Sequence, residues 1–136
     1  MAGNKILVIF GPNMNLIGLR KRDGKTRVTL DKLSRHLRKI ATKMGLSLTI
    51  LQTNNESHAV NQIQRQRKKI KGILIFPGPW QQSGYVLNDT LGILSIPCVT
   101  ISNHKKEEAL KVMKNIEEKD IYKSSEVALF ELSETI

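Results

Sequence analysis

Residues 5–18 read KILVIFGPNMNLIG, and the two halves of this stretch differ in character. After its first lysine, the segment 5–10 is apolar and rich in branched side chains, which is typical of a strand buried on both faces of a sheet. A Gly-Pro-Asn-x-Asn loop follows directly, beginning at Gly11. In α/β proteins such a loop after a buried strand usually holds a small ligand, so the stretch predicts a central strand and a ligand site together.

The rest of the chain alternates the two periodicities of regular structure. Apolar runs predict further strands over residues 46–52, 72–76, 97–102 and 127–132. Apolar residues spaced by three and four predict helices over residues 29–45, 57–71, 83–94 and 105–118. Strands that alternate with helices form a parallel sheet covered on both faces. We therefore expect one α/β domain, residues 1–136, with three layers, a flavodoxin-like fold and a five-stranded parallel sheet.

In such a sheet, ligands bind outside the carboxyl ends of the strands, near the point where the strand order reverses. Four loops are expected there, over residues 11–27, 53–56, 77–83 and 102–106. These loops should converge on one site.

The length and composition of the chain limit the class of protein and the cellular compartment to be expected. The chain has 136 residues, enough for a core that needs no metal or disulfide, and its one cysteine, Cys98, cannot form an intramolecular bridge. No apolar stretch is long enough to cross a bilayer, and the first residues do not resemble a signal or transit peptide. We expect a cytoplasmic protein, or one from an equivalent reducing compartment, with no membrane association. No metal cluster, P-loop, nucleophile elbow or dinucleotide fingerprint is present, so no cofactor or metal is expected.

The charge is strongly basic: 22 Lys and Arg face 12 Asp and Glu, for a net charge of +10. The positive electrostatic field of such a chain favours anionic partners, although a lysine-rich proteome would also explain the excess of basic residues. Two dense runs carry much of the excess, Arg20, Lys21, Arg22, Lys25 and Arg27 in the first, and Arg65, Arg67, Lys68, Lys69 and Lys71 in the second.

The second run lies at the predicted end of a helix, where a few cations would simply complement the helix dipole. Five cations exceed that role, so both runs predict binding to RNA or another polyanion, as in a nucleoprotein complex. Aromatic residues are few, and Trp80 is the one expected to be exposed in a loop. We therefore expect recognition of the backbone rather than stacking on unpaired bases.

The loops after the strands resemble those of type II 3-dehydroquinate dehydratases of the shikimate pathway. The resemblance lies in ILVIFGPNMNLIGLR, QTNNE, GILIFPG and ISN, at residues 6–20, 52–56, 72–78 and 101–103. It extends over roughly residues 5–132, and the first motif is the specific one. The resemblance implies a reaction that removes a proton beside a carbonyl, passes through an enolate and expels a hydroxyl with acid assistance. A tyrosine acidified by an arginine would be the base and a histidine the acid.

Carried over by position, the resemblance retains only part of this machinery. Asn13 would order a water or the enolate oxygen, or would merely bond the loop backbone, and Arg20 matches the loop arginine. The tyrosine position holds Lys25, and a lysine is a base only if its pKa is depressed. Glu56 matches a glutamate that supports the acid histidine, but the histidine position holds Thr100. His104 lies a few residues beyond.

The residues that would bind the substrate in this family are also altered. Phe76 stands in place of a substrate-binding asparagine, and Gln82 in place of a histidine. Asp89 is retained, to pair with Arg20 or as a plain surface carboxylate. Ser102 and Asn103 are retained and would offer donors to a substrate carboxylate, or would simply end the strand.

Three functions follow from these residues. The first is a catalytically degenerate homologue that acts as a basic binding or structural protein. The second is an active 3-dehydroquinate dehydratase that uses Lys25 or His104, and the third is an enzyme or sensor for another small anion. The resemblance also implies trimers grouped into dodecamers. Because the chain is expected to lack the family's last helix, a homo-oligomer of that kind is doubtful here.

Overall fold

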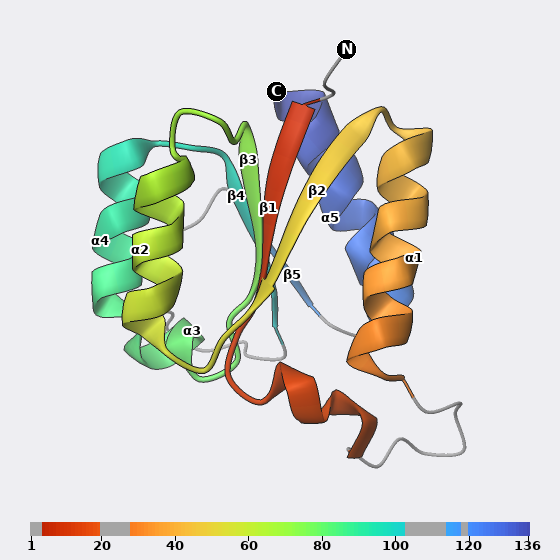
Figure 1. The fold of residues 1–136 in the computed structure, drawn as a ribbon, viewed down its shortest axis with the longest axis horizontal. Helices are drawn as coiled ribbons and strands as arrows, with labels where there is room; N and C mark the ends of the chain where they lie inside the picture. The colour runs from red at the N-terminus through yellow and green to blue at the C-terminus, as the bar shows by residue number, and fades with distance from the viewer. Residues whose placement is uncertain (1–3, 20–27, 103–113, 118–119) are drawn as a thin grey trace.

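The computed structural model describes residues 4–19, 28–102, 114–117 and 120–136. Its centre is a five-stranded sheet with the order β2-β1-β3-β4-β5, and every neighbouring pair is parallel (Figure 1). The strands are β1 Asn4–Phe10, β2 Leu46–Gln52, β3 Gly72–Phe76, β4 Cys98–Ser102 and β5 Lys114–Glu117. The predicted α/β flavodoxin-like fold with a five-stranded parallel sheet is confirmed.

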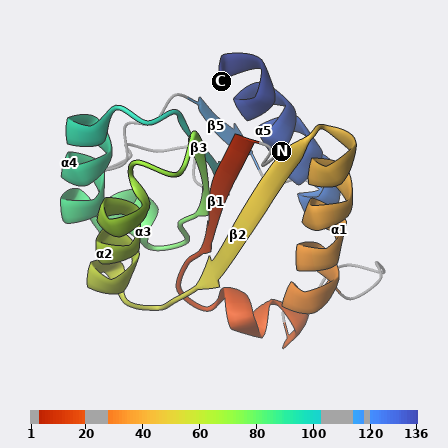
Figure 2. The same cartoon turned by 45° about the horizontal axis from the view of Figure 1, so that its top comes forward.

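Helices cover both faces of the sheet. One face carries α1 Leu30–Lys43 and α5 Ile121–Thr135, and the other carries α2 Glu56–Gln66 and α4 Tyr85–Leu94 (Figures 1 and 2). Two short helices, η1 Met14–Leu19 and α3 Trp80–Ser83, follow β1 and β3 at the carboxyl edge of the sheet. Among the described residues, none of the helices combines the length and the hydropathy of a membrane-spanning segment.

Strand β1 explains why the opening stretch of sequence is apolar throughout. Successive side chains of a strand point to opposite faces. Ile6, Val8 and Phe10 accordingly belong to the core beneath α1 and α5, whereas Leu7 and Ile9 belong to the core beneath α2 and α4. All five are fully buried, as expected for the central part of a sheet with two helical layers.

The sequence prediction was wrong in the last quarter of the chain. Lys114–Glu117 is the edge strand β5, although it falls within the predicted helix 105–118. Residues 127–132, predicted as a strand, lie within α5. A short apolar run such as 127–132 cannot be assigned by periodicity alone, and here Ala128, Leu129 and Leu132 are buried at helical spacing. The expected absence of a last helix was therefore also wrong, because α5 is that helix.

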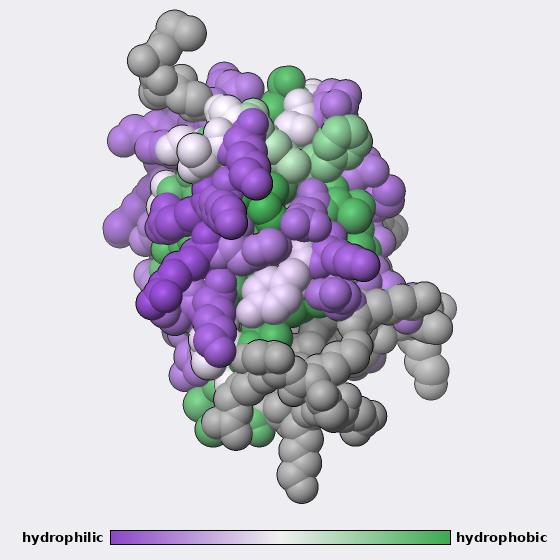
Figure 3. All heavy atoms as spheres, turned by 90° about the vertical axis from the view of Figure 1, so that its right-hand side faces the viewer, coloured by the Kyte–Doolittle hydropathy of each residue, from purple (hydrophilic) through white to green (hydrophobic). Residues whose placement is uncertain are grey.

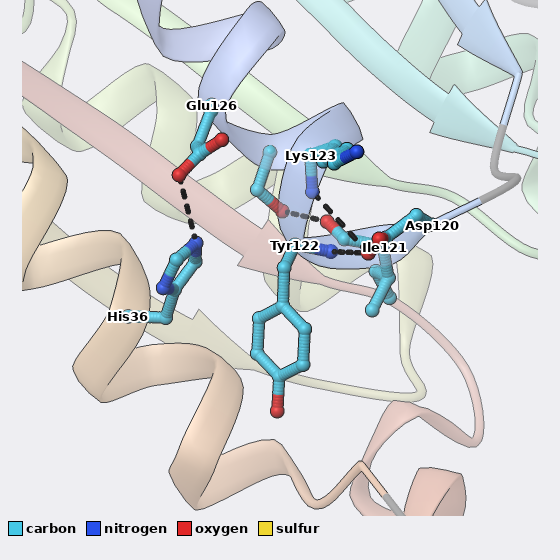
Figure 4. Close-up of polar contacts among 7 residues, drawn as sticks. His36, Asp120, Ile121, Tyr122, Lys123 and Glu126 are labelled. Atoms are coloured by element: carbon cyan, nitrogen blue, oxygen red, sulfur yellow. Dashed lines mark hydrogen bonds and ion pairs between the residues drawn. The ribbon is translucent and has the colours of Figure 1, made fainter. Parts of the chain in front are cut away.

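Helix α5 is positioned by its first turn and by contacts with α1 (Figure 4). The Asp120 carboxylate accepts hydrogen bonds from the backbone N–H groups of Tyr122 and Lys123, which caps the helix. The Tyr122 ring meets the His36 ring edge to face at 4.8 Å, and Glu126 Oε1 lies 3.5 Å from His36 Nε2. These polar contacts lie beside the apolar seam between the two helices.

The local sequence predicts both ends of α1 correctly but places the end of α2 too late. Thr29 accepts from the Lys32 N–H and caps α1, and Gly45 adopts a φ of 72° just after its end, as predicted. Helix α2 ends at Gln66, not at Lys71. The Lys69 and Ile70 N–H groups both donate to Gln66 O, at 2.8 and 3.1 Å, and form a tight turn.

The outer face of α1 and α5 is mostly hydrophilic (Figure 3). Lys32, Arg35, Arg38, Lys39 and Lys43 are all exposed on α1. The described part of this face is therefore basic along α1.

Candidate ligand site at the carboxyl edge of the sheet

Backbone hydrogen bonds join the loops that leave β1, β2 and β3. Gly11 N–H donates to Phe76 O at 2.9 Å, and Thr53 N–H donates to Phe10 O at 2.9 Å. These bonds extend the parallel sheet by one residue on each side of β1. Three of the four predicted loops therefore meet at one edge, and residues 103–106 of the fourth lie outside the described residues.

Side-chain amides hold the same loops together. Asn54 Oδ1 accepts from the Asn13 N–H at 3.0 Å and from Gln52 Nε2 at 3.2 Å. Gln52 Nε2 also lies 3.2 Å from Gly11 O. The loop after β1 is thus fixed by residues from β2 and the loop that follows it.

Two residues of the first loop have special backbone requirements. A Cβ at Gly11 would lie 2.6 Å from Phe76 O, so only glycine allows this approach of β1 to β3. Asn13 has a φ of 68°, a left-handed conformation that asparagine tolerates better than most residues. Asn13 is exposed, so its side chain is presented to solvent at the edge of the site, while its backbone is anchored by Asn54.

Phe76 lies where the family resemblance implies a polar residue that binds the substrate, and it packs against another aromatic ring. Phe10 and Phe76 pack with their ring centroids 4.9 Å apart, and both side chains are buried. Phe76 therefore belongs to the core at the carboxyl ends of the central strands. It supplies no hydrogen bond to a substrate.

A polar cluster in which the β4 side chains are buried joins β4 to β5. Thr100 Oγ1 donates to Asn115 Oδ1 at 2.6 Å, and Ser102 Oγ donates to the same oxygen at 3.0 Å. Thr100 is 0% exposed and Ser102 is 4% exposed. Ser102 was predicted from the sequence, but Asn115 was missed because its segment reads as part of a charged helix.

The Glu56 carboxylate forms a hydrogen bond with the neighbouring helix α4. Its Oε2 accepts from the Leu87 N–H at 2.9 Å, in the first turn of α4. Gly84, the residue before α4, has no side chain to cap that helix, so Glu56 performs this role from α2. Glu56 was predicted to support an acid at position 100, whereas its observed hydrogen bond is to α4.

One expectation was wrong in the short helix α3. Trp80 was expected to be exposed, but it is only 5% exposed and packs beneath α2 and α4. Its ring fits there because Gly11 has no side chain. Gln82 is exposed, whereas Gln81 is fully buried. Neither the Oε1 nor the Nε2 atom of Gln81 has a hydrogen-bond partner among the described residues.

The remaining predicted residues divide into two groups. Asp89 is described and is exposed on α4. Residues outside the described ranges are Arg20, Lys21, Arg22, Lys25, Arg27, Asn103 and His104. The candidate base Lys25, the Arg20–Asp89 pair and the candidate acid His104 are therefore not placed by the structure.

The second basic run lies away from this site. Arg65, Arg67, Lys68, Lys69 and Lys71 are all exposed, at the end of α2 and in the turn that leads to β3. Since β3 begins just after this turn, the run is at the amino edge of the sheet, opposite the loops described above (Figure 1). Only Arg65 remains in the last turn of a helix, so the helix dipole cannot account for the run.

The described residues offer no evident metal or thiol chemistry. No group of three or more His, Cys, Asp or Glu side chains among them could hold a metal ion. Burial raises the pKa of the Cys98 thiol far above its ordinary value, so the thiol stays protonated and unreactive at neutral pH.

Comparison with protein families identifies this architecture. The model of the family "Dehydroquinase class II" matches residues 4–123. A 3-dehydroquinate dehydratase of Clostridium acetobutylicum is 34% identical over 107 residues, which cover 76% of this chain and 74% of that protein. One from Carboxydothermus hydrogenoformans is 36% identical over 107 residues, 76% of this chain and 70% of that protein.

Solved structures agree on the fold. A type II dehydroquinase from Butyrivibrio crossotus superposes with a TM-score of 0.84 at 23% identity, over 97% of this chain and 99% of that one. A 3-dehydroquinate dehydratase-like protein from Bifidobacterium longum gives 0.73 at 17% identity, over 96% of each chain. At these identities the superpositions establish the fold alone.

Proposed function

Since the chain belongs to the class II dehydroquinase family, we propose that it retains the fold of a 3-dehydroquinate dehydratase without the acid–base pair, and acts as a basic binding protein. The observation that carries this proposal is the hydrogen bond from Thr100 to Asn115. Position 100 is where the family resemblance calls for the acid.

The chemistry explains why this substitution matters. Expulsion of a hydroxyl needs a proton donor whose pKa lies near the working pH, and an aliphatic alcohol is far too weak an acid. The Thr100 hydroxyl is also directed at Asn115 Oδ1, and the residue is 0% exposed. Loss of one partner of an acid–base pair typically lowers a rate by about 10²–10⁴.

The rest of the edge supports the same proposal. Phe76 packs on Phe10 in place of a polar substrate contact. The Glu56 carboxylate caps α4. The family's loops are thus held in place by hydrogen bonds, while several positions that the reaction would use hold side chains that serve the fold.

The binding partner is argued from charge. Five exposed cations lie between Arg65 and Lys71, and no acidic residue interrupts them. A run of cations this dense suits a polyanion such as RNA, because Lys and Arg bind its phosphates whatever the base sequence.

A second candidate function is 3-dehydroquinate dehydratase activity itself. It is favoured by the relatives, since proteins about a third identical to this chain bear that name. It would require Lys25 as a base with a depressed pKa, or His104 as the acid.

The two candidates are separated by turnover of 3-dehydroquinate, followed as the ultraviolet absorbance of the enone product. Under our proposal the wild-type protein, Lys25→Ala and His104→Ala all give the rate of buffer alone. Turnover by the wild-type protein that either substitution abolishes would refute the proposal and identify the replacement group.

A further inference from the structure

The basic turn after α2 is joined to cations from two other parts of the chain. The Lys71 N–H donates to Lys5 O at 2.8 Å, so the chain entering β3 lies beside the start of β1. On its other side Lys5 pairs in register with Ser47 of β2. Helix α1 ends at Lys43, just before β2 begins at Leu46.

These contacts bring the amino ends of β2, β1 and β3 together at one edge (Figure 1). Five lysines occur there, and we call them the amino-edge rim: Lys5, Lys43, Lys68, Lys69 and Lys71. The segments that supply them, residues 4–5, 43–47 and 65–71, contain no acidic residue. Lys5 is half-buried and the other four are exposed.

We infer that the amino-edge rim binds the phosphodiester backbone of a nucleic acid duplex. The inference rests on the proposed function, because it assumes that the chain binds a polyanion. It goes further in naming the surface, in adding Lys5 and Lys43 to the basic turn, and in naming the form of nucleic acid.

The rim is held in place by the fold. Ile70, which lies between Lys69 and Lys71, is buried in the core beneath α2 and α4. Gln66 O accepts from both the Lys69 and Ile70 N–H groups, which closes the turn. Because the backbone is already ordered, binding costs less conformational entropy than it would for a disordered basic tail.

The spacing of the rim suits a dense array of phosphates. Adjacent strands of a sheet lie about 4.8 Å apart, so Lys5 and Lys71 start from neighbouring positions. Duplex DNA carries one phosphate per ~1.7 Å of helix axis, a far higher charge density than a single carboxylate or phosphate ligand offers. Cations at the start of β1, at the end of α1 and in the turn before β3 can together contact several phosphates of one duplex.

The absence of aromatic residues favours a duplex over a single strand. Proteins that bind single strands combine a basic groove with aromatic side chains on which bases stack. Residues 4–5, 43–47 and 65–71 contain no aromatic residue. The rim therefore offers phosphate contacts without a stacking platform.

The rim and the candidate ligand site are at opposite edges of the sheet (Figure 1). Strand β1 has 7 residues, and a strand rises about 3.3 Å per residue. The two edges are thus separated by the length of the central strands. Binding at the rim should not depend on Thr100 or Phe76.

The test compares two variants with the same change in net charge. The rim variant carries Lys68→Ala, Lys69→Ala and Lys71→Ala. The control carries Lys32→Ala, Lys39→Ala and Lys123→Ala, three exposed positions on α1 and α5. Fluorescence anisotropy with a short RNA duplex and a DNA duplex of the same sequence is measured between about 50 and 200 mM salt. Circular dichroism melting confirms that both variants fold.

We expect the wild-type affinity to fall with log salt at a slope of about −4.5, for five phosphate contacts. The rim variant should bind at least about tenfold more weakly, with a slope near −2, whereas the control keeps the wild-type slope. Equal losses in the two variants would overturn the inference and leave diffuse charge as the cause, with polyanion binding intact. Tighter binding to single-stranded poly(U) or to poly-glutamate would overturn the assignment of a duplex. No binding to any of these would refute the proposed function as well.

Discussion

Thr100 of β4 and Asn115 of β5 form a short hydrogen bond at the carboxyl edge of the sheet, 2.6 Å from Oγ1 to Oδ1. The bond joins a central strand to the edge strand where the family resemblance calls for an acid. It has a structural role, because Asn115 Oδ1 also accepts from Ser102 Oγ, so that one amide holds two buried hydroxyl groups of β4.

Thr100→Val removes this hydrogen bond and keeps the shape of a β-branched side chain. We expect the free energy of unfolding to fall by about 1 kcal/mol, the usual net value of one intramolecular hydrogen bond. Urea unfolding followed by circular dichroism measures it. A variant as stable as the wild-type protein would show that the bond contributes nothing to the fold.

Gln81→Met should stabilise the protein. Gln81 is 0% exposed and its two amide atoms have no partner among the described residues, and an unsatisfied buried polar group costs about 1–3 kcal/mol. Thermal unfolding of this variant is compared with that of Gln82→Met, at the exposed neighbour, which should stay within about 0.5 kcal/mol of the wild-type protein. Destabilisation by Gln81→Met would mean that the amide is satisfied in solution.

Two glycines provide a matched pair for backbone effects. A Cβ at Gly11 would lie 2.6 Å from a backbone oxygen, whereas a Cβ at Gly92 in α4 would meet nothing within 4 Å. Gly11→Ala should therefore cost about 1–3 kcal/mol through forced backbone shifts. Gly92→Ala should add about 0.5–1 kcal/mol, because alanine favours a helix. Chemical denaturation of both variants checks the difference in sign, and a tolerated Gly11→Ala would contradict the close approach of β1 and β3.

Cys98 makes the stability depend on pH in the alkaline range. Burial raises the pKa of its thiol in the folded state, so above about pH 8.5 the unfolded chain loses a proton that the folded chain keeps. The unfolded state then gains stability, and the free energy of unfolding from this group should fall by about 1.4 kcal/mol per pH unit. Urea titrations of the wild-type protein and Cys98→Ala between pH 7 and 10 isolate the effect. Identical pH profiles would contradict it.

The sequence predicted the first three quarters of the fold because the signals there are strong. The apolar run Ile6–Phe10 is followed at once by a Gly-Pro turn signal, which favours a doubly covered strand, and α1 has a capping threonine and a terminal glycine. The edge strand β5 lacks such signals: it has 4 residues, and none of them is buried. Helix α5 was mistaken for a strand because its apolar residues are consecutive.

The candidate site was predictable in position but not in detail. The convergence of loops follows from the parallel order of strands, and Ser102 was named because ISN, at residues 101–103, resembles the family's motif at the end of the fourth strand. Asn115 could not be found, since its role depends on a strand that the local sequence does not indicate. The burial of Gln81 and Trp80 depends on the tight approach at Gly11, which no helical or strand pattern reveals.

The central claim, that the family's acid–base reaction is absent from this chain, is tested most directly by nuclear magnetic resonance of 3-dehydroquinate with the wild-type protein in deuterated water. This one measurement reports both half-reactions, because loss of the proton beside the carbonyl appears as deuterium exchange and full turnover appears as product. The 3-dehydroquinate dehydratase of Clostridium acetobutylicum serves as the positive control. We expect neither exchange nor product above the rate in buffer. Deuterium exchange alone would reveal a working base without an acid, and product formation would show that the chain is a dehydratase and contradict the account.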